Sequence, residues 1–331
     1  MWPVETQRVR IISRIAAPLM GLMLLWLPGP SSGQSYPERP IVLTVAYAPG
    51  GATDLQARIV SLPARNEAYF GQPMIISNKP GAGGKVGWTW FMTRARKTGY
   101  DVAAYNLPHV IAQSIVFDAA YGVDNLEPIA NWGADPAVLI VGRNSPFESV
   151  ADVLAYARNN PRRITASGAG LYVGHHIALL QFERATDTEL TYVPHTGGTP
   201  ALTAVIAGQV QAGFNNLSDA YRSRDQLKIL AVADLERNQE FLPDVPTFLE
   251  QGVDVDDSSV NFRGLMVPEG TPPEVIDILA ERAPSMFRDS EVLRRMREGG
   301  APMRIMEREE VRSMWQRRQA ILQDLLTDLR E

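Results

Sequence analysis

The 331-residue sequence contains no cysteine. Disulfide bonds, thiolate metal sites and cysteine nucleophiles are therefore excluded, and so is a lipid anchor attached to an N-terminal cysteine. Basic charge is also in short supply, because 32 Lys and Arg residues stand against 37 Asp and Glu residues, giving a formal charge of −5. Nucleic-acid binding depends on a basic surface and is not expected here.

Recognisable catalytic signatures are missing as well. The sequence has no G-x-S-x-G, no H-E-x-x-H and no S-x-x-K motif with suitable partners. The histidines are His109, His175, His176 and His195. A metal site needs three or four converging ligands, whereas the adjacent pair would point in two directions on a helix. We therefore expect no catalytic residue, no metal and no cofactor. His109 and His195 are predicted to line a pocket wall, and His176 to hydrogen-bond locally at a helix start.

Long hydrophobic runs are scarce, and the one that matters lies near the N-terminus. Three arginines precede an apolar stretch at 15–27, which is followed by small and turn-forming residues up to Gly33. This order is typical of a secretory signal, so residues 1–33 are predicted to be a signal peptide cleaved near Gly33. A retained anchor is less favoured, because the stretch is shorter than the ~20 residues that cross a membrane and contains Pro18.

Strand-like and helix-like segments alternate through the rest of the chain. Apolar runs predict strands at 41–46, 74–77, 102–105, 138–141, 163–166, 189–193, 212–215, 228–233 and 263–267. Helical periodicity predicts helices at 54–68, 150–159, 176–184, 200–207, 273–287, 290–298 and 309–329, the first of them kinked or split by Pro63. Regular alternation of this kind indicates an α/β fold in which parallel sheets carry helices on both faces.

Two segments interrupt the alternation and predict crossings between domains. One is 131–138, which contains Gly133, Asp135 and Pro136, and the other is the acidic stretch 251–261. If the chain crosses at both, residues 138–258 form one domain, and residues 36–137 plus 259–331 form the other. Two α/β domains joined in this way have a cleft between them whose closure can enclose a ligand.

Four glycine-rich loops follow predicted strands. They are APGGATD (48–54), NKPGAGG (78–84), SGAG (167–170) and HTGGTP (195–200). A strand, a glycine turn and a helix N-terminus together aim unpaired backbone N–H groups at one point, which favours an anion. The first two loops predict a site for a small carboxylate, with the N–H groups of residues 51–53 as candidate contacts. Thr53 or Asp54 is expected to cap the first helix, because a carboxylate beside the site would repel an anion.

Longer motifs recur in a fixed order along the chain. They are YPERPI (36–41), APGGATD (48–54), GQP (71–73), NKPGAGG (78–84), GY (99–100), VPHTGGTPAL (193–202), GQV (208–210), FNNL (214–217), LPDVPT (242–247) and PEGTPP (268–273). With these motifs the chain resembles the Bug-type solute-binding proteins of tripartite tricarboxylate transporters, from Tyr36 to the last helix. The resemblance implies two doubly wound domains with a hinge and an interdomain cleft, the Venus flytrap of type II periplasmic binding proteins. It also implies a periplasmic receptor that delivers a small carboxylate to one large and one small permease subunit.

The resemblance further implies where the ligand lies. The first two glycine loops would hold a ligand carboxylate through backbone N–H groups and waters, and loops of the other domain would set specificity. The chain departs from the family at that far end, where His195-Thr196 replaces the usual Tyr-Lys pair. We expect His195, Thr196, Tyr172 and Asn215 to decide which carboxylate binds. The predicted ligand-binding residues are Tyr47, Pro49, Gly51, Ala52, Thr53, Asp54, Gly83, Gly84, Asn106, Ser167, Gly170, Tyr172, His195, Thr196, Gly197, Gly198 and Asn215.

Two other functions are compatible with the same residues. A periplasmic sensor could present the closed form of this fold to a signalling partner. An exported enzyme acting on a carboxylate is a weaker alternative, because the sequence lacks a nucleophile or metal set. The leading prediction is a transport receptor that acts as a monomer and is not inserted in the membrane after signal cleavage.

Overall fold

The computed structural model describes residues 1–3, 36–117 and 119–327. The predicted signal peptide and its cleavage site near Gly33 fall almost entirely outside these residues. The chain divides into Met1–Ser35 and the compact unit Tyr36–Glu331, and the description below concerns the second. No helix within the described residues is both long and apolar enough to cross a membrane.

The first sheet is built from both ends of the compact unit. Its strand order is β11-β4-β10-β3-β1-β2. The strands are β1 Ile41–Val45, β2 Met74–Asn78, β3 Asp101–Leu107, β4 Leu126–Asp135, β10 Asn261–Pro268 and β11 Met303–Met306. β1 pairs in parallel with β2 and β3, whereas β10 is antiparallel to β3 and β4, and β11 is antiparallel to β4. We call this sheet with its helices the first lobe.

The second sheet comes from the middle of the chain and has the order β7-β6-β8-β5-β9. Its strands are β5 Ala137–Gly142, β6 Thr165–Gly168, β7 Thr191–Pro194, β8 Ala212–Asn216 and β9 Leu227–Ala233. β6 pairs in parallel with β7 and β8, but β5 is antiparallel to β8 and β9. Both sheets are therefore mixed, and the expectation of parallel sheets holds only for β1, β2 and β3 and for β6, β7 and β8. We call this sheet with its helices the second lobe.

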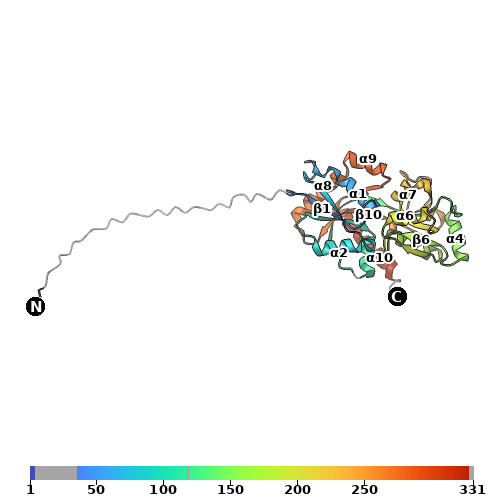
Figure 1. Cartoon of the computed structure of the whole chain (residues 1–331), viewed down its shortest axis with the longest axis horizontal. Helices are drawn as coiled ribbons and strands as arrows, with labels where there is room; N and C mark the ends of the chain where they lie inside the picture. Colours follow the sequence, from blue (N-terminus) through green and yellow to red (C-terminus); the bar gives the residue numbers. More distant parts are fainter. Residues whose placement is uncertain (4–35, 118, 328–331) are drawn as a thin grey trace. The chain divides into compact units, whose positions relative to one another are not determined.

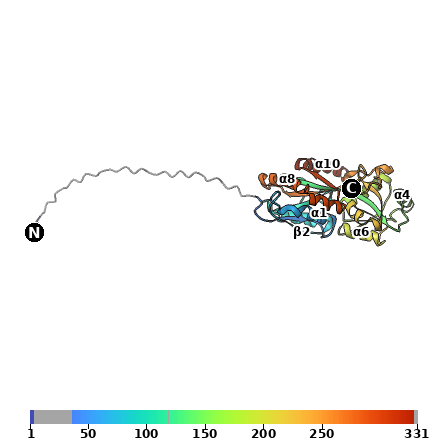
Figure 2. The same cartoon turned by 90° about the horizontal axis from the view of Figure 1, so that it is seen from above.

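Helices cover both faces of each sheet, so both lobes are doubly wound (Figures 1 and 2). The first-lobe helices are α1 Ala52–Ser61, α2 Lys85–Arg94, α3 His109–Phe117, α8 Pro273–Phe287, α9 Ser290–Glu298 and α10 Arg308–Thr327. The second-lobe helices are α4 Val150–Asn159, α5 Gly174–Thr186, α6 Gly198–Ile206 and α7 Leu217–Arg222. Strand β5 shows why two layers form, because Val138 and Ile140 enter one apolar core while Leu139 and Val141 enter the other.

The chain changes sheets at the two places that interrupted the sequence pattern. A single residue, Pro136, separates β4 from β5, so the segment 131–138 is strand on both sides rather than an irregular linker. One residue leaves no room for a crossover helix, which a parallel connection would need. Strands β4 and β5 accordingly pair antiparallel with their neighbours, β4 with β10 and β11, and β5 with β8 and β9. The return to the first sheet occurs between β9 and β10. There Asp256 caps a 3₁₀ turn at Asp257–Ser259 that leads into β10. The domain limits at 137/138 and 258/259 stay predictions.

Candidate functional site

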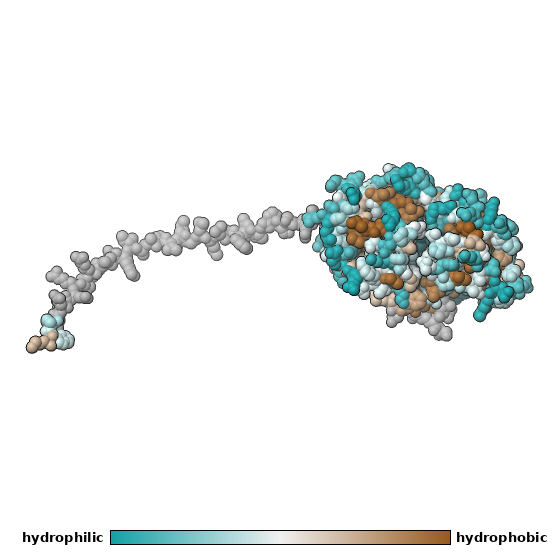
Figure 3. Space-filling model, viewed as in Figure 1, coloured by the Kyte–Doolittle hydropathy of each residue, from teal (hydrophilic) through white to brown (hydrophobic). Residues whose placement is uncertain are grey.

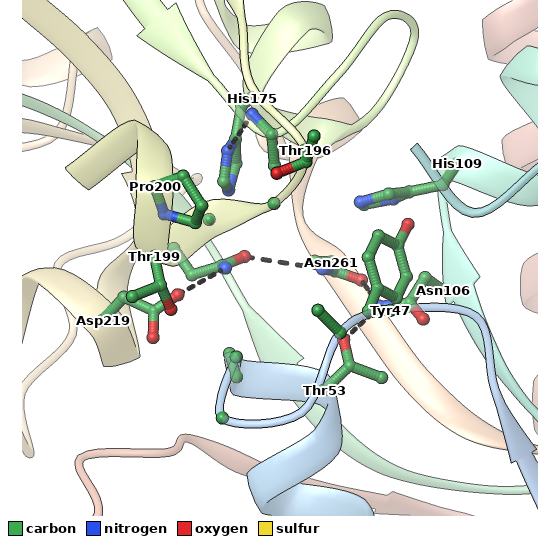
Figure 4. A pocket seen from close by; sticks show the side chains of 18 of the residues that line it. Tyr47, Thr53, Asn106, His109, His175, Thr196, Thr199, Pro200, Asp219 and Asn261 are labelled. Atoms are coloured by element: carbon green, nitrogen blue, oxygen red, sulfur yellow. Dashed lines mark hydrogen bonds between the residues drawn. The ribbon is translucent and has the colours of Figure 1, made fainter. Parts of the chain in front are cut away.

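A cavity of about 270 Å³ lies between the two sheets, and both lobes contribute its walls (Figure 4). We call it the main cavity. The surface is hollowed between the lobes in the space-filling view (Figure 3). The first lobe supplies Tyr47, Ala48, Pro49, Gly50, Gly51, Ala52, Thr53, Asn106, His109, Asn261 and Arg263. The second lobe supplies Ala169, His175, Thr196, Gly197, Gly198, Thr199, Pro200, Asn216 and Asp219.

The N-terminus of α1 opens onto the main cavity. Its N-cap is Gly51, which has no side chain to accept a hydrogen bond, so the first N–H groups of the helix have no side-chain cap. The preceding turn needs glycine at Gly50, where φ is +87°. Capping by Thr53 or Asp54 was therefore a wrong prediction. Uncapped N–H groups and the helix dipole make this end of the cavity favourable for an anion.

Asp54 turns away from the cavity and holds the first glycine loop together. Its Oδ2 accepts from the Gly50 N–H at 2.9 Å and from Arg58 Nε at 2.9 Å, while Oδ1 accepts from Asn78 Nδ2 at 2.8 Å. Burial acts to raise the pKa of Asp54, but hydrogen bonds from Arg58 and Gly50 outweigh it and lower the pKa below its usual range. Asp54 is thus an ionised brace for the turn.

The floor of the main cavity carries a completely buried ion pair. Arg263 of β10 donates from Nη1 to Asp135 Oδ2 at 2.7 Å, and both side chains are 0% exposed. The same guanidinium donates to Thr53 Oγ1 at 3.1 Å and to Asn216 Oδ1 at 3.0 Å. Asp135 lies where the chain leaves the first sheet, and it also accepts from the N–H and hydroxyl of Ser218. This network joins both lobes beneath the cavity.

Two asparagines complete the floor. Asn106 Nδ2 donates to Thr53 Oγ1 at 2.9 Å and to Asn261 Oδ1 at 3.1 Å. Asn261 in turn donates to Asn216 Oδ1 at 3.4 Å (Figure 4). Because both donations use its amide nitrogen, the orientation of Asn106 is fixed, and its buried Oδ1 has no partner in the described part of the chain.

The histidines of the main cavity are neutral. Burial, and then the neighbouring His175, hold the pKa of His109 well below its usual range. Burial likewise lowers the pKa of His175 to about 4, against smaller opposing effects of Asn216 and Asp135. His175 Nδ1 accepts from the Ala169 N–H at 3.1 Å, so α5 presents a neutral imidazole to the cavity. Neither ring supplies a second cation at pH 7.

The second-lobe wall is built around the N-terminus of α6, whose N-cap is Gly197. Asp219 lies against this end, because a Cβ added at Gly198 would come within 3.0 Å of Asp219 Oδ2. Asp219 is 3% exposed and forms an ion pair with Arg222 of the same helix α7. Burial raises the pKa of Asp219, an effect that Arg222 opposes. A carboxylate therefore already lies at this end of the cavity.

A second cavity of about 550 Å³ lies beside the first and shares Thr196 with it. We call it the side cavity. Its lining residues are Ala82, Gly83, Lys85, Phe117, Gly170, Leu171, Pro194, His195 and Thr196. The second glycine loop thus faces the side cavity, whereas the first faces the main one. The two loops lie in adjacent βα units, but they do not converge on one cavity.

The predicted site residues fall into three groups. The main cavity is lined by Tyr47, Pro49, Gly51, Ala52, Thr53, Asn106, Thr196, Gly197 and Gly198. The side cavity is lined by Gly83, Gly170 and His195, together with Thr196. Neither cavity is lined by Asp54, Gly84, Ser167, Tyr172 or Asn215. For all seventeen residues, ligand contact stays a prediction.

The residues that line neither cavity have structural partners. Ser167 Oγ donates to the Ala201 carbonyl at 2.9 Å, and Asn215 Nδ2 donates to the Gly198 carbonyl at 3.0 Å. Tyr172 packs edge-on against Phe117, with ring centroids 5.3 Å apart. These contacts hold the walls in place from behind.

The prediction for His176 at the helix start is confirmed. His176 Nδ1 accepts from the Tyr172 N–H at 3.1 Å, and its ring stacks on Tyr192. His109 and His195 each line a cavity, as expected of pocket-wall residues. No group of His, Cys, Asp or Glu among the described residues could hold a metal ion.

Sequence reasoning missed several polar and charged side chains of the main cavity. They are His175, Asn216, Asp219, Asn261 and Arg263. Arg263 left one signal in the sequence, because it is the single charged residue of the mainly apolar strand Asn261–Pro268. The partner of that charge is 128 positions away, at Asp135.

Comparison with known proteins agrees with this architecture. The sequence profile described as "Tripartite tricarboxylate transporter family receptor" matches residues 57–325. The "UPF0065 protein in gbd 5'region" of Cupriavidus necator is 30% identical over 281 residues, which cover 82% of this chain and 83% of that protein.

Two solved structures share the fold. The periplasmic binding protein BugD has a TM-score of 0.78 and 26% identity, over 88% of this chain and 98% of that one. MatC from Rhodopseudomonas palustris with bound malate has a TM-score of 0.79 and 25% identity, over 88% of this chain and 100% of that one. Both similarities extend over the two lobes rather than over one.

Proposed function

Because the chain belongs to the tripartite tricarboxylate transporter receptor family, we propose that it captures a small carboxylate in the main cavity and, in the periplasm, delivers it to a large and a small permease subunit. The family consists of solute-binding receptors, not of enzymes. The proposal adds the ligand class, the location of the site and the membrane partners to that family membership.

The observation that carries the ligand class is the meeting of two positive features in one cavity. The uncapped N-terminus of α1 and the guanidinium of Arg263 both line the main cavity, and Arg263 Nε donates to Thr53 Oγ1 in the first turn of that helix at 3.1 Å. A unit charge pair at about 4 Å and an effective dielectric of ~20 is worth about 4 kcal/mol. Asp135 offsets part of this attraction, but it does not line the cavity, whereas Arg263 does. The cation, and not its counter-ion, is thus part of the cavity surface that a carboxylate would meet.

The relative with a known ligand supports the same class. MatC binds malate, a small carboxylate, in a fold that superposes over 88% of this chain. The histidines of the main cavity are neutral, and its polar floor is internally hydrogen-bonded. No described group of this cavity is arranged as a nucleophile with its base, which suits a receptor.

Thermal unfolding with a ligand panel tests the binding step. Carboxylates are compared with their own primary amides, which keep the shape and lose the charge. At about a hundredfold excess over Kd, a true ligand stabilises by about 2.7 kcal/mol, a shift of roughly 5 °C for a chain of this size. A panel in which amides stabilise as well as acids, or in which no carboxylate stabilises, would overturn the proposal.

Delivery needs a separate measurement. Membrane vesicles that contain the large and small permease subunits should accumulate the best-stabilising carboxylate only when this protein is added to the outside. Mass spectrometry of the bound and released compound should recover it unchanged. Stabilisation without uptake would leave a binding protein and remove the transport role.

A further inference from the structure

The formal charges that line the main cavity are already paired. Arg263 faces Asp135, and Asp219 faces Arg222. Besides these, the cavity has only neutral lining residues among those described. Its α1 end can take one ligand carboxylate, but its far end already contains the carboxylate of Asp219. A second ligand carboxylate placed there would meet like charge in a poorly solvated site.

The side cavity offers the opposite situation. Its single formally charged lining residue is Lys85, and no Asp or Glu of the described chain pairs with it. The ammonium lies 4.6 Å from the ring centre of Phe117 instead. Lys85 is also the first residue of α2, whose N-cap Gly84 provides no capping side chain. A cation at a helix N-terminus is unfavourable, and a bound anion would relieve that repulsion. The attraction for the anion rests on the ammonium and the helix dipole, because the N–H groups of Gly84, Lys85 and Val86 already donate to the carbonyls of residues 81 and 82.

A second polar group lines the same cavity. The backbone N–H of His195 donates to the Gly168 carbonyl at 2.8 Å, which fixes the position of the loop. Its buried Nε2 has no hydrogen-bond partner within the described residues. The ring can therefore turn toward a ligand without losing a hydrogen bond. Leu171, Phe117 and Pro194 supply apolar walls between these polar groups, which suit a chain of methylene groups.

We propose that the side cavity is the subsite for a second anionic group of the ligand, held by Lys85 and His195. In this arrangement one molecule lies along Thr196, which lines both cavities, and reaches from the α1 N-terminus to Lys85. The preferred ligand is then an extended dicarboxylate rather than a short one or a monocarboxylate. This inference rests on the proposed function for the position of the first carboxylate.

The test is a titration of matched ligands against matched lysine variants. Lys85→Met keeps the aliphatic stem on Phe117 and removes the charge. Lys79→Met is the control, because Lys79 also lies 4.6 Å from an aromatic ring, that of Trp90, and lines neither cavity. Isothermal titration calorimetry is run with malonate, succinate, adipate and suberate, and with hexanoate as the monocarboxylate of adipate's length.

For the wild type we expect affinity to rise from malonate toward a longer member, and that member to bind more tightly than hexanoate. Lys85→Met should weaken the best dicarboxylate about tenfold, equal to 1.4 kcal/mol, and leave hexanoate unchanged. Lys79→Met should change neither. Equal losses for adipate and hexanoate, or no loss for any dicarboxylate, would overturn the side-cavity subsite while leaving the proposed function intact. Failure of every carboxylate to bind would overturn both.

Discussion

The buried ion pair between Arg263 and Asp135 gives a prediction that separates stability from binding. Arg263→Met removes the guanidinium at a position that is 0% exposed and leaves Asp135 without its cation. Asp135 keeps its hydrogen bonds from Ser218 and a long contact of 3.5 Å from Gln56, but its charge is then uncompensated. Breaking a buried pair in this way costs about 3–5 kcal/mol. Urea unfolding followed by circular dichroism should show that loss as a lower midpoint.

The double variant supplies the control. Asp135→Asn with Arg263→Met removes both charges, and replacing both partners of a buried pair is far less costly than removing one. The double variant should therefore be more stable than either single variant. The coupling energy of the cycle should be on the order of 2–3 kcal/mol. Additive losses, or a single-variant loss below about 1 kcal/mol, would refute the view that the two charges stabilise the folded protein as a pair.

The same double variant then tests the ligand anchor in a folded protein. Arg263 lines the main cavity and Asp135 does not, so losing the pair removes more attraction than repulsion for a bound carboxylate. We expect at least a tenfold weaker Kd for hexanoate in the double variant. Unchanged affinity would mean that the N-terminus of α1 holds the carboxylate without the guanidinium.

Two further predictions follow from local geometry. Burial lowers the pKa of His175 to about 4 from its ordinary 6.5. Protonation therefore favours the unfolded chain, and about 3 kcal/mol of folding stability that is present above pH 6.5 is lost as the pH falls to 4. His175→Gln should flatten the dependence of the urea midpoint on pH in that range, and an unchanged slope would contradict the assignment. Gly84→Ala should cost about 2–3 kcal/mol, because φ is +104° and the new Cβ would lie 2.6 Å from the Trp88 ring. Gly208→Ala, with φ +68° and open space, should cost only about 1 kcal/mol, and equal losses in the two variants would contradict the packing argument.

Much of the fold was predictable because its signals are local. The helices Val150–Asn159, Pro273–Phe287 and Ser290–Glu298 have the predicted bounds, and α1 ends at Ser61, just before Pro63. Strand β4 was missed because Pro128 and Gly133 interrupt its apolar pattern. It forms nonetheless, since β10 and β11 pair with it on both sides and absorb the irregularities as register shifts. Those partners are more than a hundred residues away, where sequence periodicity carries no information.

The candidate site was likewise predictable where its residues are adjacent in sequence, and was missed where they come from distant segments. The glycine loops were found because a strand, a glycine turn and a helix start are adjacent in sequence. The ion pair of the floor and its partner Asn216 were missed because the floor is assembled from four separate segments around Arg263. The first two loops line different cavities, whereas the sequence suggested that both hold one carboxylate; their contact with a ligand stays a prediction. Tyr47 donates to the Gly83 carbonyl at 2.9 Å and Gln113 donates to it at 3.2 Å, and these bonds fix the position of the second loop.

The position of the second glycine loop beside the side cavity determines which part of a ligand it can contact. In the main cavity, every formal charge has its partner within the described protein. The α1 N-terminus can hold one anion there, but no unpaired cation among the described lining residues remains to attract a second. In the side cavity, Lys85 and the start of α2 place two positive features together without a described counter-ion. A ligand with a single carboxylate would leave that charge uncompensated, whereas a second carboxylate would neutralise it. The unpaired lysine therefore favours a dianion. Because the α1 N-terminus and Lys85 line different cavities, the two carboxylates of such a ligand need a spacer between them.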